Sequence, residues 1–141
     1  MRFYILIFSL LFMHVSFSQD KCKYANRKIN KIEQKILIGD NDRVLHDLKK
    51  IESLCGDPIF LHTLADMYLS IKELDRALNY YVDCYNLSGL KYFNSISLKN
   101  FLNSAYNRGW YSIFNIVVND SMFHIKIPID QTMNDLIEKN N

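Results

Sequence analysis

Residues 61–81 read LHTLADMYLSIKELDRALNYY, and this stretch decides the fold. Its apolar positions recur every three or four residues on either side of a short polar turn near residues 71–73, which predicts two helices joined as a hairpin. Ala65 and Ala77 are small, so the two helices can cross closely there, and Tyr68 and Tyr81 are large enough to fill the space beside the crossing.

The residues before this hairpin predict another helix pair. Isoleucines at helical spacing predict a helix over residues 22–37, and Gly39 is placed to end it in the left-handed conformation that glycine tolerates. A second helix follows with an apolar face over residues 44–54. It ends at Gly56, after which Asp57 is a candidate N-cap and Pro58 suits the first turn of the next helix.

The residues after the hairpin repeat the arrangement. A helix is predicted over residues 92–107, a turn over residues 107–109 and a helix over residues 110–118. Only four glycines and two prolines interrupt the 141 residues. The sequence therefore predicts an all-α protein built from consecutive antiparallel helix hairpins.

The central hairpin resembles a tetratricopeptide repeat, whose pattern is W-x2-L-G-x2-Y, then A-x3-F, then P. The pattern positions from W to F are held here by Leu61, Leu64, Ala65, Tyr68, Ala77 and Tyr81. The flanking units depart from the pattern at Glu33 and Lys99. The resemblance implies a short solenoid of about three repeats over residues 22–56, 57–90 and 91–119, closed by a capping helix within residues 120–141.

The first 18 residues have the layout of a secretory signal peptide. Arg2 precedes a short apolar run, and small residues follow at Ser16 and Ser18, so we expect cleavage before Gln19 and a single domain over residues 19–141. An uncleaved membrane anchor is the alternative, but the run is shorter than the roughly 20 residues of a spanning helix. We expect a periplasmic or secreted protein with no stable membrane insertion after cleavage.

The net charge of the chain is +2, with positive and negative residues mixed along its length. This balance is typical of an ordinary solvated surface, and it lacks the strong basic excess of a nucleic-acid-binding protein.

Three cysteines are present, and an exported protein can oxidise them. Cys22 begins the first predicted helix and Cys55 follows the second, so an antiparallel hairpin brings them together and predicts a disulfide. Cys84 lies on the packing face of its helix, where a buried, unreactive thiol is the expected state.

No sequence motif indicates an enzyme or a cofactor site. The only chemical pair is His62 and Asp66, four residues apart on one helix, with no further ligand at metal-binding spacing. We therefore expect a protein without catalytic activity, cofactor or metal.

The resemblance implies a module that binds a peptide or a protein partner. In such arrays the first helix of each repeat lines a concave groove, so the implied contact residues are Asn30, Gln34, His62, Asp66, Asn100 and Asn103. A structural subunit that docks on a larger envelope assembly through its C-terminal helix is the alternative. By helical phase, Tyr80 and Tyr111 are expected to be the most exposed of the aromatic side chains.

Overall fold

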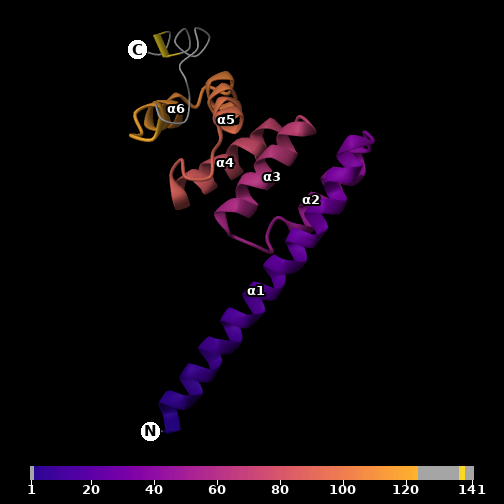
Figure 1. The fold of residues 1–141 in the computed structure, drawn as a ribbon, viewed down its shortest axis with the longest axis vertical. Coiled ribbons are helices and arrows are strands. Elements are labelled where there is room, and N and C mark those ends of the chain that lie inside the picture. Colours follow the sequence, from indigo (N-terminus) through magenta and orange to yellow (C-terminus); the bar gives the residue numbers. More distant parts are fainter. Residues whose placement is uncertain (1, 124–136, 139–141) are drawn as a thin grey trace.

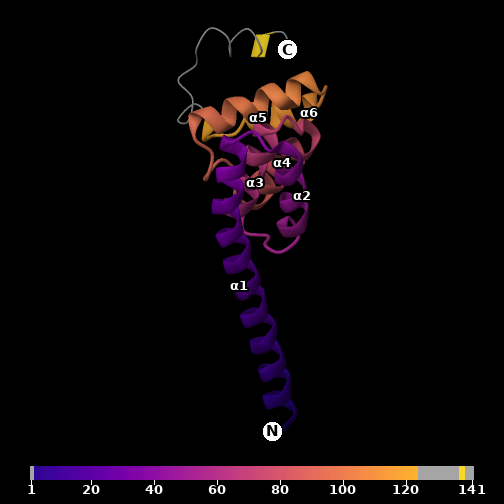
Figure 2. The same ribbon diagram turned by 90° about the vertical axis from the view of Figure 1, so that its right-hand side faces the viewer.

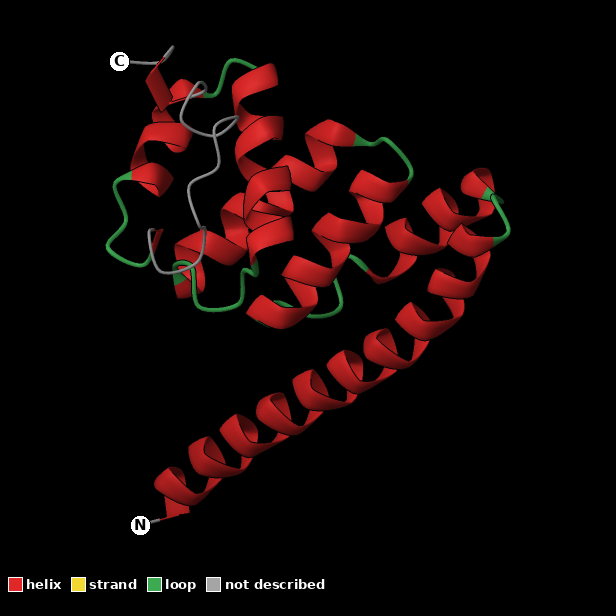
Figure 3. Cartoon of the chain, turned by 45° about the horizontal axis from the view of Figure 1, so that its top comes forward, coloured by secondary structure: helices red, strands yellow, loops and turns green. Residues whose placement is uncertain are grey.

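The computed structural model describes residues 2–123 and 137–138, with side chains from residue 19 onward, and within these residues the chain is all-α (Figure 3). No strand occurs in this part of the chain, which confirms the predicted fold class. The helices are α1 (Arg2–Leu37), α2 (Asn41–Ile51), α3 (Pro58–Ser70), α4 (Leu74–Ser88), α5 (Ser95–Asn107) and α6 (Tyr111–Val118).

The helices pack as three consecutive hairpins. The pairs α1 with α2, α3 with α4 and α5 with α6 are in contact, and the hairpins are joined through α1 with α3 and through α4 with α5. Figure 1 shows this order, with α3 and α4 in the centre, and Figure 2 shows the same stack from the side. The first part of α1 extends well beyond the stack toward the N-terminus.

The two helices of the central hairpin make the most extensive contact of any helix pair in the described part of the chain. All six residues that carry the repeat pattern are buried: Leu61, Leu64, Ala65, Tyr68, Ala77 and Tyr81. One apolar cluster runs from α1 through α2 and α3 to Ala77. The second cluster begins at Leu61 and Ala65 and continues through α4, α5 and α6 to Phe123. The α3–α4 hairpin contributes to both clusters, so it connects the two outer hairpins through their buried side chains.

The turns between helices use the residues that the sequence predicts. Asp57 accepts hydrogen bonds from the backbone N–H groups of Ile59 and Phe60, and Pro58 occupies the first turn of α3. Gly39 ends the α1–α2 turn with a φ of 77°, a left-handed conformation that costs other residues energy. Asp57 and Pro58 thus fix where α3 starts, and Gly39 lets the chain turn from α1 into α2.

Three predicted helix boundaries were wrong. The second helix ends at Ile51 rather than just before Gly56, so Leu54 lies in the connection to α3. The first helix begins at Arg2 rather than at residue 22, since no breaker separates the apolar N-terminal run from the helix that follows. The fifth begins at Ser95 rather than at residue 92. Here Asn94 is the N-cap and forms a capping box with Ser97, in which each side chain accepts a hydrogen bond from the other's backbone N–H. This arrangement sets the first residue of the helix at Ser95.

The predicted C-terminal capping helix falls largely outside the described residues, which stop at Phe123 and resume only at 137–138. Phe123 is fully buried, Ile137 packs against the second apolar cluster, and Asp120 accepts a hydrogen bond from the Tyr85 hydroxyl at 3.0 Å. Among the described residues, no helix combines the length and apolarity needed to cross a membrane.

Candidate functional site

Two of the six candidate contact residues meet in a pocket between α3 and α5. Its volume is about 300 Å³, and Asp66 from α3 and Asn100 from α5 both line it. The rest of the lining consists of Leu69, Ser70, Asn94, Ile96 and Ser97. Ile96 is 70% exposed, so the pocket has an apolar residue at its surface as well as polar side chains.

A second, wider pocket lies between α1 and α3. It measures about 690 Å³ and is lined by Lys23, Asn26, Arg27, Ile29, Asn30, Glu33 and Thr63. A third candidate contact residue, Asn30, is among them. Because both pockets include residues of α3, they lie at the two successive junctions between the first helices of the hairpins.

The other three candidates differ in their surroundings. Gln34 and Asn103 are exposed and line neither of these pockets. His62 is largely buried, with its side chain 11% exposed and its ring edge-on to the rings of Tyr81 and Phe93. Its Nε2 atom is buried and has no hydrogen-bond partner in the described part of the chain.

Asp66 is held in place from both sides. The Tyr81 hydroxyl donates a hydrogen bond to Oδ1, and His62 Nδ1 lies 3.3 Å from Oδ2. Burial first, and then the hydrogen bond to Asp66, raise the pKa of the Tyr81 phenol above its usual value, so this donor keeps its proton. The Asp66 side chain is still 45% exposed, which leaves a pre-oriented carboxylate facing the α3–α5 pocket.

A polar network that the sequence did not predict joins the end of α2 to α3 and α4. Glu52 Oε2, just after α2, accepts hydrogen bonds from Tyr68 at 2.6 Å, Tyr80 at 3.0 Å and Arg76 at 3.1 Å. The rings of Tyr68 and Tyr80 are stacked, with centroids 5.6 Å apart. Burial first, and then the bond to Glu52, raise the pKa of both phenols.

This network corrects the expectation for Tyr80. The side chain is half-buried against Tyr68, whereas Tyr111 is exposed as expected. The partners of Glu52 are 16, 24 and 28 residues further along the chain, so no local spacing in the sequence indicated the cluster.

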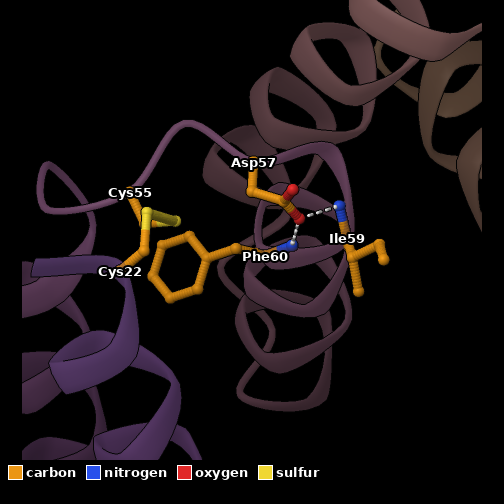
Figure 4. The surroundings of a disulfide bond; sticks show 5 residues. All are labelled: Cys22, Cys55, Asp57, Ile59 and Phe60. Carbon is orange, nitrogen blue, oxygen red and sulfur yellow. Dashed lines mark hydrogen bonds between the residues drawn. A yellow bond between two sulfur atoms is a disulfide. The ribbon is translucent and has the colours of Figure 1, made fainter. Parts of the chain in front are cut away.

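The predicted disulfide is present between Cys22 of α1 and Cys55 in the α2–α3 connection, with Cα atoms 4.7 Å apart. Figure 4 shows the Phe60 ring beside the bond and the cap made by Asp57 close by. The bond therefore joins the first hairpin to the start of the second. Cys84 is a free, buried thiol, and burial raises its pKa, as its position on the packing face predicts.

Across residues 19–123 and 137–138, no group of three or more histidine, cysteine, aspartate or glutamate side chains is arranged to hold a metal ion. Comparison of the chain with protein-family models, with curated proteins and with solved structures gives no match. Function is therefore inferred from the residues of the chain itself.

Proposed function

We propose that this chain is a non-enzymatic interaction module of the cell envelope or the secreted space. It belongs with tetratricopeptide-like helical repeats, and it binds a peptide or a protein partner along its first helices, α1, α3 and α5. The observation that carries this proposal is the α3–α5 pocket, where Asp66 and Asn100 come from different repeats and line one cavity.

The chemistry of the lining suits an extended peptide backbone. Asparagine presents both a donor and an acceptor, so Asn30 and Asn100 can pair with the backbone N–H and C=O groups of a ligand. Asp66 is already oriented by Tyr81, so little side-chain entropy is lost when it accepts a hydrogen bond from the ligand. Ile96, exposed beside them, offers an apolar contact for a ligand side chain.

The disulfide supports an exported location. Bonds of this kind form and persist in oxidising compartments such as the periplasm or the extracellular space. The bond between Cys22 and Cys55 lies just after the signal-like residues 1–18. We expect the mature protein recovered from its host to begin at Gln19, and N-terminal sequencing of that protein is the direct measurement.

Affinity capture from envelope and secreted fractions, with the chain tagged at its C-terminus, tests the binding surface. The test variant is Asn30→Ala with Asn100→Ala, which removes one amide from each pocket without touching the buried His62. The matched control is Asn79→Ala with Asn86→Ala, two exposed asparagines of α4.

A partner recovered in a stoichiometric amount with the unaltered chain and the control, but lost with the test variant, supports the first-helix groove. Each removed amide that pairs with the ligand is expected to weaken binding by about 1 kcal/mol, or roughly fivefold. Equal recovery by the test and control variants would reject the groove as the working surface.

A further inference from the structure

A lysine-rich cleft lies between α1 and α2, separate from the two pockets of the first-helix face. Its volume is about 240 Å³, and its lining consists of Tyr24, Lys28, Lys31, Ile32, Lys35, Asp47, Lys50 and Ile51. Tyr24, Lys28, Lys31 and Lys35 follow one another at spacings of four, three and four, so they form one stripe along α1. The ammonium groups thus come from a single face of α1 and from the facing helix α2.

The charge of the cleft is unbalanced. Four lysines and one aspartate line it, for a formal charge of +3, although the whole chain carries only +2. Asp47 is already engaged in an ion pair with Lys35, and the hydrogen bond from Lys35 is the main cause that lowers the pKa of this carboxyl. Lys28 lies over the ring of Tyr24 at 5.3 Å. Within residues 19–123, no carboxylate forms an ion pair with Lys28, Lys31 or Lys50.

Interaction with helix dipoles explains only part of this clustering. Lys35 and Lys50 lie in the last turns of α1 and α2, where a cation stabilises the C-terminal end of a helix. Lys28 and Lys31 lie further inside α1, beyond the reach of that effect. Like charges placed around one cavity repel each other, and a bound anion is what would offset that repulsion.

We propose that the α1–α2 cleft binds a small polyanion through Lys28, Lys31 and Lys50, with Tyr24 and Ile32 against its less polar part. The cavity is smaller than the usual 300–1,000 Å³ of a drug-sized ligand site, so its occupant is a compact molecule bearing phosphate or carboxylate groups. Lysine ammonium groups donate to either kind of oxygen. This site uses none of the residues assigned to partner binding, so each proposal stands or fails without the other.

Titration calorimetry of the full chain at low ionic strength tests the cleft, with pyrophosphate and citrate as probes. Saturable binding of one or both anions is expected, and it weakens as salt is added. Tighter binding of pyrophosphate identifies phosphate as the recognised group, and tighter binding of citrate identifies carboxylate. The test variant is Lys31→Gln with Lys50→Gln, both at exposed positions of the cleft. The control is Lys49→Gln with Lys72→Gln, which removes the same charge from exposed positions outside the cleft.

The test variant is expected to bind the preferred anion at least tenfold more weakly than the unaltered chain, because two charged donors are lost. The control is expected to lose clearly less affinity than the test variant, because its two lysines lie outside the cleft and act only through the overall charge. The absence of saturable heat with either anion at concentrations up to about 10 mM would overturn the proposal. An equal loss of affinity in the test and control variants would also overturn it.

Discussion

Replacement of both Cys22 and Cys55 by alanine is expected to lower the free energy of unfolding by about 4 kcal/mol. The disulfide joins positions 33 residues apart and so closes a loop of about 34 residues in the unfolded chain. In the chain-entropy treatment of cross-links, a loop of that length loses about 13 cal/mol/K of entropy, which corresponds to nearly 4 kcal/mol at 25 °C. In the folded protein the two Cα atoms lie 4.7 Å apart, which is within the usual range for a disulfide. The bond therefore acts mainly on the unfolded chain.

Urea denaturation followed by circular dichroism measures this difference. A thermal melt measures the same effect as a shift in the melting temperature. For a domain of about 120 residues, a loss of about 4 kcal/mol divided by the entropy of unfolding gives a fall of about 15 °C. The unaltered protein provides its own control, because a reductant should lower its stability to that of the double variant and leave the variant unchanged. A loss below about 1 kcal/mol would show that loop closure in the unfolded state is not the source of the stabilisation. A reductant effect on the variant would show that the reductant acts on a group other than this bond.

Three further outcomes are expected. Ala65→Leu places extra carbon atoms in the fully buried α3–α4 crossing and should cost about 1–3 kcal/mol in urea denaturation, whereas Asn79→Leu on the exposed face of α4 should cost little. Glu52→Ala leaves the hydroxyls of Tyr68 and Tyr80 without their acceptor and should cost about 2–3 kcal/mol, with Glu52→Gln costing less than half of that because the amide oxygen still accepts. Burial, and then the hydrogen bond to Asp120, raise the pKa of Tyr85 from 10.0 to about 12, so the unfolded chain loses this proton first and stability falls as pH rises from 10 to about 12. The free energy of unfolding of Tyr85→Phe, measured across that range, should fall less than that of the unaltered chain.

The helices and their turns were predictable because their signals are local. Asp57 and Pro58 mark the start of α3 in sequence, and the same two residues make the cap and the first turn in space. The spacing of apolar residues fixed the face of α4 that is buried. The start of α5 was misplaced because Tyr92 and Phe93 are apolar enough to continue a helical pattern, while the hydrogen bonds between Asn94 and Ser97 decide the boundary.

The surroundings of the polar side chains were harder to predict. His62 has a polar neighbour at helical spacing and so resembles a surface residue, but Phe93 from the connection before α5 packs edge-on against its ring and helps to bury it. Glu52 accepts hydrogen bonds from side chains of α3 and α4. The spacing of residues within one helix cannot predict such contacts between helices. Asp66 and Asn100 could be paired from the sequence only through the repeat resemblance, since 34 positions separate them.

The place of the disulfide determines how the molecule responds to a pulling force. A tension applied at the N-terminus reaches Cys22 and passes through the sulfur bridge directly to Cys55, and from there into α3. Residues 23–54, which include the rest of α1 and all of α2, lie inside the covalent ring and are bypassed by that load. About 110 Å of extended chain is thereby withheld from stretching, so the bridged molecule is shorter and stiffer under tension than its reduced form.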